Sequence, residues 1–243
     1  MTRPFLTAEW RWLLMMNYAC DPRILLPFVP AHTELDDFRG THYVSMVGFR
    51  FLQTRVLGFP VPFHTNFDEV NLRFYVRRRA DGEWRRGVVF IKELVPRSAI
   101  AAVARYAYGE NYQSLPMRHA IVMPSNGNAG NVQYEWRING EWNSMSANFD
   151  GDPDPLAPGS EAEFIAEHYW GYTKRTDATF EYRVDHPSWR ALSVKDTALC
   201  CDVARLYPPG VAEVLALRPV SAFLADGSAI KVFTGAPILR AGN

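Results

Sequence analysis

Pairs of turn-forming residues constrain the fold of this chain more than any other feature. Asp81-Gly82 separates the segment NLRFYVRRR (71–79) from EWRRGVVFIKEL, and Asn139-Gly140 separates VQYEWRI from EWNSMSANF. Asp226-Gly227 forms a further pair near the C-terminus. Such pairs tolerate the positive φ angles that a tight hairpin turn requires. Hairpins at these places, between short strands, indicate a mainly antiparallel sheet that forms a barrel or a sandwich.

The segments around these turns have the residue pattern of strands. The stretch 41–56 is rich in β-branched and aromatic residues, and residues 71–79 alternate apolar with polar side chains, so one face should be buried. The stretch 12–20 (WLLMMNYAC) is apolar but short, and it lacks a convincing cleavage site. We predict a buried strand there, rather than a signal peptide or a membrane span.

Helical patterns are fewer. Residues 96–109 have small apolar residues at helical spacing, and Gly109 would end that helix. Ser160 and Glu163 form a capping box that starts a second helix, which we expect to carry Phe164, His168 and Tyr169 along one face. A third, short helix is expected at 187–194 or at 208–216.

One proline-rich loop, 150–159, is the only plausible domain boundary. Because strand patterns continue after it, we expect a single domain over residues 1–243. The formal net charge is zero, which argues against a nucleic-acid partner. Cysteines number three, and Cys200 and Cys201 are adjacent, which is typical of a reduced, cytoplasmic chain.

No sequence motif indicates a metal or a cofactor. The chain has no C-x-x-C or H-E-x-x-H spacing, and the Gly- and Asn-rich segment 125–131 lacks the context of a phosphate-binding loop. We therefore expect no metal, no cofactor and no membrane partner.

Several stretches together resemble one family. They are DPRILLPFVP with THYVSMVGF, HTNFDEVNLRFYVR, GVVFIKELVPRSAIAAVARYAYGENY, and EAEFIAEHYWGYTKR with VDHPSW. They resemble motifs of the YqjF-like family of uncharacterised proteins, across most of the chain. The resemblance implies a mainly β fold similar to that of acetoacetate decarboxylase. This fold is a closed antiparallel β-barrel with a few flanking helices and an internal cavity.

The same resemblance implies which chemistry is missing. Acetoacetate decarboxylase forms a Schiff base through the lysine of a Trp-Gly-x-Pro-Lys turn, and Tyr112 matches that lysine here. The decarboxylase also has an arginine in a Tyr-Arg-Thr-Asp stretch, and Ala19 matches that arginine here. A glutamate in the pocket of the decarboxylase does have a counterpart, Glu69. Because a phenol cannot form an imine, Schiff-base decarboxylation is not expected.

Polar residues on the strand at 71–79 and just before it are candidate ligand contacts. Glu69, Asn71 and Arg73 are two residues apart, so they share one side of a strand. Arg73 beside Glu69 would keep the carboxylate ionised and could bind a ligand carboxylate through two hydrogen bonds. The alternative is a structural ion pair within the barrel wall. Tyr112 would either donate a hydrogen bond into the cavity or hold its hydroxyl in water at the barrel end.

The segment EHYWGYTKRT (167–176) contains further titratable groups. His168 is a candidate for proton transfer, because the pKa of histidine lies near the working range of acid–base catalysis, but it could equally be a packing residue. Lys174 follows Gly171, and we expect it at a solvated strand edge rather than as an imine-forming amine.

These observations leave three functions open. The first is a non-covalent small-molecule binder that uses Glu69, Asn71, Arg73 and Tyr112 in an aromatic cavity. The second is an enzyme that acts on a small oxo- or carboxylic acid, with His168 or Glu69 transferring a proton. The third is a structural or partner-binding protein with a packed barrel.

Overall fold

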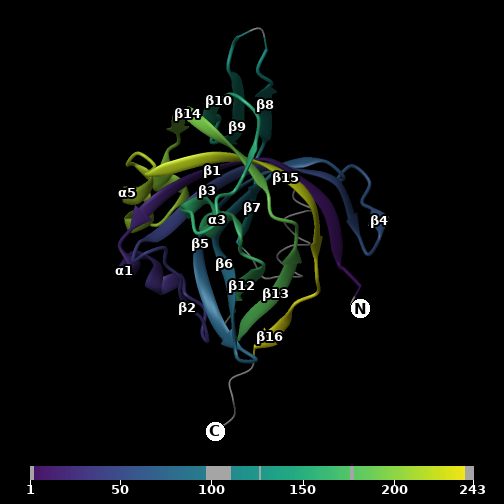
Figure 1. The fold of residues 1–243 in the computed structure, drawn as a ribbon, viewed down its shortest axis with the longest axis vertical. Coiled ribbons are helices and arrows are strands. Elements are labelled where there is room, and N and C mark those ends of the chain that lie inside the picture. Colours follow the sequence, from purple (N-terminus) through teal and green to yellow (C-terminus); the bar gives the residue numbers. More distant parts are fainter. Residues whose placement is uncertain (1–2, 97–110, 126, 176–177, 239–243) are drawn as a thin grey trace.

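The structure is a computed structural model that describes residues 3–96, 111–125, 127–175 and 178–238. It is mainly β, with a few short helices (Figure 1). Its strands are β1 (Leu6–Cys20), β2 (Glu34–Leu35), β3 (His42–Val56), β4 (Phe59–Pro60), β5 (Phe67–Ala80), β6 (Glu83–Val95), β7 (Tyr112–Ser114), β8 (Met117–Val122), β9 (Gly130–Ile138), β10 (Glu141–Phe149), β11 (Asp154–Pro155), β12 (Trp170–Lys174), β13 (Thr179–Asp185), β14 (Arg190–Cys200), β15 (Ser221–Val232) and β16 (Ala236–Ile238). The helices are α1 (Pro22–Leu25), the 3₁₀ helix η1 (Leu26–Phe28), α3 (Glu161–Ala166), α4 (Val203–Leu206) and α5 (Pro209–Leu215).

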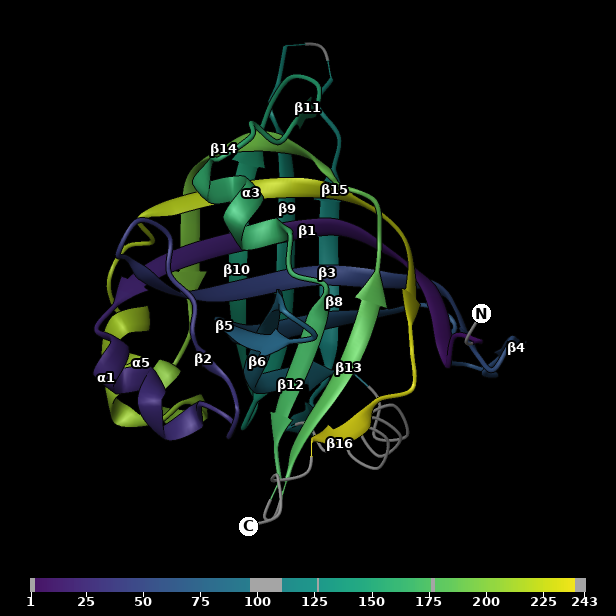
Figure 2. The same ribbon diagram turned by 60° about the horizontal axis from the view of Figure 1, so that its bottom comes forward.

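A ring of strands forms the centre of the molecule. The hydrogen-bonded order is β13, β12, β6, β5, β3, β1 and β15, and β15 pairs again with β13, which closes the ring (Figures 1 and 2). The predicted mainly β fold, a closed barrel with a few helices, is therefore confirmed, although its strands are not all antiparallel. The pairing is mixed, because β12 runs parallel to β6. Parallel neighbours need a long connection, and here the whole segment from β7 to α3 lies between these two strands.

A second layer covers one side of this ring. Strands β14, β10, β9 and β8 continue the sheet beyond β15 and cross the outer face of β1, β3 and β5 (Figure 2). The core between the layers contains Leu14, Met46, Leu72, Tyr134 and Met145, all fully buried. Strands β1, β3 and β5 are consequently buried on both faces, which explains the nearly continuous apolar run at 12–20.

Two of the three expected hairpin turns are confirmed. Asp81-Gly82 joins β5 to β6 with φ angles of 51° and 84°, and Asn139-Gly140 joins β9 to β10 with φ angles of 48° and 91°. The third prediction is wrong, because Asp226-Gly227 lies inside β15 and Gly227 pairs with Arg11 of β1. Gly227 has φ of 79°, so its positive φ bends a strand instead of ending one.

The helix that begins at Ser160 is shorter than predicted. Ser160 caps it as expected, accepting a 3.1 Å hydrogen bond from the Glu163 amide, while the Glu163 carboxylate accepts from the Gly159 amide. The helix ends at Ala166, so His168 and Tyr169 lie beyond it, because the chain must extend to pair Trp170 with β6.

Two further helix predictions have different outcomes. Residues 208–216 contain α5, whereas 187–194 lead into β14. The helix expected at 96–109 lies, apart from Pro96, outside the described residues. No helix in the described part of the chain is long and apolar enough to cross a membrane.

Candidate functional site

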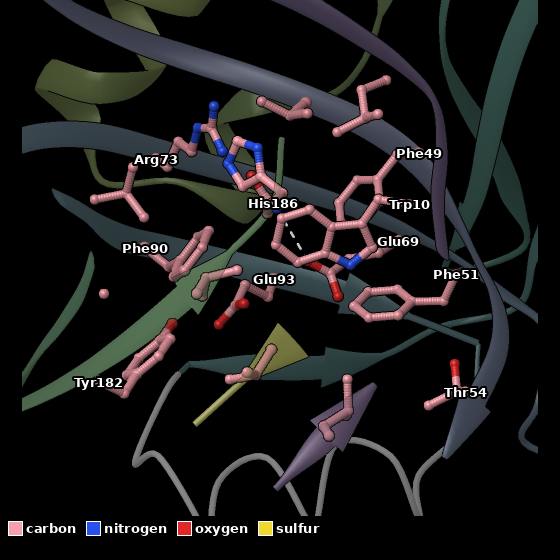
Figure 3. Close-up of a pocket in the computed structure, with 18 of the residues that line it drawn as sticks. Trp10, Phe49, Phe51, Thr54, Glu69, Arg73, Phe90, Glu93, Tyr182 and His186 are labelled. Carbon is pink, nitrogen blue, oxygen red and sulfur yellow. Dashed lines mark hydrogen bonds between the residues drawn. The ribbon is translucent and has the colours of Figure 1, made fainter. Parts of the chain in front are cut away.

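The ring of strands encloses a cavity of about 180 Å³. All seven ring strands contribute side chains to it, including Trp10 of β1, Phe49 and Phe51 of β3, Phe90 of β6, and Tyr182 of β13 (Figure 3). The described part of the barrel therefore contains an internal cavity with aromatic walls, as predicted.

Aromatic side chains form one continuous apolar wall. The ring centroids of Trp10 and Phe49 lie 5.4 Å apart in an edge-to-face arrangement, and Phe51 stacks on Phe67 at 4.5 Å. The ring centroid of Trp189 lies 6.2 Å from that of Trp10. Such mutual packing holds the wall rigid without filling the cavity.

Strand β5 supplies a row of polar side chains. Glu69, Asn71 and Arg73 all line the cavity, and each is at most 8% exposed. Their neighbours Val70 and Leu72 point to the opposite side, into the core between the two layers. The prediction that these three polar residues share one face is correct, and it follows from the two-residue period of a strand.

Glu69 is held by hydrogen bonds. Its Oε1 accepts a 3.0 Å bond from Asn71 Nδ2, and its Oε2 accepts a 3.4 Å bond from the Tyr112 hydroxyl. Tyr112 lies in β7 and lines the cavity, so its hydroxyl points inward. Of the two alternatives for Tyr112, the geometry favours hydrogen bonding into the cavity.

Arg73 does not form the expected ion pair with Glu69. Four residues along a strand separate the two Cα atoms by roughly 13 Å, which is too far for a direct contact between these side chains. Arg73 instead donates from Nη2 to the carbonyl oxygen of Ile165 at 3.2 Å. Among the described residues, no carboxylate lies within the 4.0 Å ion-pair distance of its guanidinium.

His168 is buried at the cavity wall. Its ring lies 4.7 Å from that of Tyr75 and 5.2 Å from that of Phe164. Nε2 of His168 is 3.6 Å from Oδ2 of Asp36, which also accepts a 2.7 Å hydrogen bond from Arg86. Burial lowers the pKa of His168 to about 4, although Asp36 opposes this shift. The imidazole that faces the cavity is therefore neutral near pH 7.

Several residues of the site were not found by sequence reasoning. Glu93 of β6 is 1% exposed and lies opposite Asn71 in the strand register. The one sequence feature that could have indicated Glu93 is that it is an acidic residue within an apolar run. No sequence pattern indicated Asp36, because it follows the two-residue strand β2 and belongs to no helix or strand itself. His186 stacks on Trp189 at 4.2 Å and also lines the cavity.

None of the lysines lines the cavity. Lys92 points to Gln113, with Nζ 3.3 Å from its Oε1, and Lys174 is exposed and donates to the Pro27 carbonyl at 3.0 Å. Lys195 lies in β14 outside the ring, and Lys231 borders a groove on the outer surface. In the part of the chain that the structure describes, no cluster of three histidine, cysteine or acidic residues is placed to hold a metal ion.

Comparisons with known proteins agree with this architecture. A model of the family DUF2071, described as "Uncharacterized conserved protein (COG2071)", matches residues 7–229. The chain is 26% identical over 188 residues to "Uncharacterized protein YqjF" of Bacillus subtilis (strain 168), across 74% of this chain and 72% of that protein.

Solved structures of the acetoacetate decarboxylase type are similar in fold. Acetoacetate decarboxylase from Legionella pneumophila has a TM-score of 0.66 at 13% identity, covering 98% of this chain and 88% of that chain. The enduracididine biosynthesis enzyme MppR complexed with pyruvate has a TM-score of 0.64 at 13% identity, covering 98% of this chain and 91% of that chain. At such identities the similarity concerns the fold alone. The chain belongs to the DUF2071 family of uncharacterised conserved proteins, and it has the acetoacetate decarboxylase-like fold.

Proposed function

We propose that this protein binds a small organic molecule non-covalently inside the ring of strands. The observation that carries the proposal is a cavity inside the ring whose walls combine aromatic side chains with a row of polar groups, Glu69, Asn71, Arg73 and Tyr112. Ligand sites typically have this composition, with apolar walls and a few polar groups that fix orientation. Because no lysine lines the cavity, binding proceeds without an imine.

The size of the cavity limits the ligand. Its volume is about 180 Å³. An engineered apolar cavity of about 150 Å³ in another protein holds benzene. A ligand with a single ring, or a short branched chain, therefore matches the space in this barrel.

Wall atoms without partners support an occupied cavity. Within the described part of the chain, Asn71 Oδ1 and Trp10 Nε1 are buried and have no hydrogen-bond partner. Buried polar atoms are usually hydrogen-bonded, so these two atoms are available to a ligand in the cavity. MppR, which is similar in fold, is a pyruvate complex, so a barrel of this type is able to hold a small molecule.

An enzyme that acts on a small oxo- or carboxylic acid is the second candidate. One observation favours it: neutral His168 contacts the cavity on one side and Asp36 on the other. A histidine close to a carboxylate is a common arrangement for proton transfer. Glu69 is the other candidate proton carrier, because its carboxylate also borders the cavity.

The third reading, a packed barrel that serves only as a structural or partner-binding protein, has less support, because the ring encloses open space. We place the protein in the reduced cytoplasm, because its cysteine count is odd and Cys200 and Cys201 are adjacent. We also treat residues 1–243 as one domain.

Thermal stabilisation by a panel of single-ring and short-chain compounds tests the proposal. The panel contains matched acids, amides and alcohols. A ligand at about a hundred times its Kd should stabilise the protein by about 2.7 kcal/mol. Asn71→Leu should weaken this stabilisation, whereas Asn148→Leu, on β10 outside the ring, should leave it unchanged. If no compound shifts the melting temperature of the wild-type protein, the proposed function is wrong.

A further inference from the structure

We propose that the cavity selects a monocarboxylic acid with a compact aromatic or branched body, and that Arg73 binds its carboxylate. This inference rests on the proposed function and adds the charge of the ligand to it. It follows from the surroundings of Arg73, from the strand neighbours of that residue and from the shape of the apolar wall.

Arg73 is a buried cation without an anionic partner. The residue is 8% exposed, and its guanidinium makes its hydrogen bonds from Nη2, to the Ile165 carbonyl at 3.2 Å and to the Met15 sulfur at 3.9 Å. Its Nε has no partner, and no carboxylate of the described residues is within ion-pair distance. A buried charge is costly unless it is paired, so a site that retains one is prepared for a counter-ion.

The groups nearest to Arg73 do not supply that negative charge. His168 and His186 both have a lowered pKa, chiefly because of burial, and the charge of Arg73 acts in the same direction on both. Both imidazoles are therefore neutral near pH 7 and leave the guanidinium uncompensated. Tyr75 offers only a ring face, at 5.7 Å from the guanidinium carbon. Figure 3 shows Arg73 and His186 together at one end of the cavity.

The guanidinium is already oriented for recognition. The Ile165 carbonyl that it contacts belongs to the last turn of α3, where backbone oxygens have no partner within the helix. This contact fixes one nitrogen and leaves the remaining donors of the planar fork for a ligand. A carboxylate matches such a fork through two parallel hydrogen bonds.

The apolar wall begins next to this anchor. Phe90 stands opposite Arg73 in the register of β5 and β6, so a body attached to the carboxylate meets the Phe90 ring first. Trp10 and Phe49 continue the wall. The carboxyl groups of Glu69 and Glu93 border the same cavity, which disfavours a second carboxylate on the ligand. One acid group and one compact apolar body is the combination that fits.

Calorimetric titration with benzoate, benzamide and benzyl alcohol tests the inference. The three probes share a ring and differ in charge. In the wild-type protein, we expect benzoate to bind at least about tenfold more tightly than benzamide. Arg73→Met should abolish this preference, and Arg73→Lys, which keeps the charge but loses the planar fork, should reduce it. Arg118→Met, at an exposed arginine paired with Glu135, is the matched control and should behave like the wild-type protein.

The outcomes separate this inference from the proposed function. Equal affinity for benzoate and benzamide in the wild-type protein, or a benzoate preference that persists in Arg73→Met, overturns the carboxylate inference and leaves the binding function standing. If none of the probes binds and no compound of the wider panel shifts the melting temperature, the proposed function fails and this inference fails with it.

The stability of the unliganded protein gives a second, independent readout. Removal of a structural guanidinium should lower the melting temperature strongly, whereas removal of an unpaired buried cation should not. We expect unliganded Arg73→Met to melt no lower than the Arg118→Met control. A melting temperature well below that of the control, or a variant that does not fold while Arg73→Lys does, would show that the guanidinium serves the fold and would overturn its assignment as a ligand anchor.

Discussion

The Oδ2 atom of Asp36 lies 3.6 Å from Nε2 of His168, at the wall of the cavity. The two residues come from distant parts of the chain, and Asp36 also accepts a hydrogen bond from Arg86. The carboxylate of Asp36 is therefore close to the imidazole of His168 without a hydrogen bond, while burial keeps that imidazole neutral. Protonation of His168 therefore opposes folding, which has a measurable consequence.

Stability should fall as the pH drops from about 6.5 to about 4. His168 has a pKa of about 4 in the folded protein, against 6.5 for an ordinary histidine. Within this window the unfolded chain binds more protons than the folded one, so the free energy of unfolding decreases as the pH falls. The full separation of the two pKa values corresponds to about 3 kcal/mol. His186 contributes in the same direction, because its pKa is also lowered.

Urea unfolding at about pH 7 and about pH 5 measures this dependence. His168→Gln removes the titrating group and should reduce the loss of stability between the two conditions without abolishing it. His32→Gln, at an exposed histidine, is the control. An unchanged pH dependence in His168→Gln would mean that burial does not hold this imidazole neutral.

Borohydride treatment in the presence of pyruvate or acetoacetate should leave no covalent adduct. The reason is that no lysine lines the cavity and that Tyr112, which the family resemblance matches to the Schiff-base lysine, carries a phenol. Intact-protein mass spectrometry detects the adduct if it forms. A stoichiometric adduct that maps to Lys92 or Lys174 would contradict the prediction.

Gly227→Ala should destabilise the ring of strands severely. A Cβ atom at Gly227 would lie 2.0 Å from the Trp10 carbonyl oxygen, and φ at this residue is 79°. We expect a loss of more than about 3 kcal/mol from strain and overpacking together. Gly82→Ala is the matched control: φ is 84°, but no atom lies within 4 Å of the added Cβ. It should lose only about 1 to 2 kcal/mol, and similar losses in the two variants would show that the close approach to Trp10 is not limiting.

Gly48→Ala should loosen the contact between the two layers. The added Cβ would lie 2.6 Å from Cδ2 of Tyr134 and 2.8 Å from Sδ of Met145. Overpacking of this kind costs about 1 to 3 kcal/mol in chemical denaturation. Gly210→Ala, in α5, meets only Ile24 at 3.5 Å and should be neutral or stabilising by up to about 1 kcal/mol. A Gly48→Ala protein as stable as Gly210→Ala would contradict the close packing of the layers.

Part of the candidate site could be predicted from sequence because it depends on local geometry. Strand periodicity alone places Glu69, Asn71 and Arg73 on one face, and the structure has them there. The predicted ion pair between Arg73 and Glu69 is wrong, because two side chains on the same face of a strand, four residues apart, need not be in contact. The contact partners of His168 and Arg73, namely Asp36 and Ile165, lie far away in the sequence, so no local pattern could indicate them.

The sequence by itself determined the strand character of the chain, two of its hairpins and the Ser160 cap. These features depend on the φ preferences and side-chain periodicity of neighbouring residues. Only the tertiary structure decided that β15 closes the ring on β13, that Asp226-Gly227 bends a strand instead of ending it, and that the enclosed space stays open. Those outcomes depend on the pairing of strands remote in sequence and on how their side chains pack, and neither is encoded within any short segment.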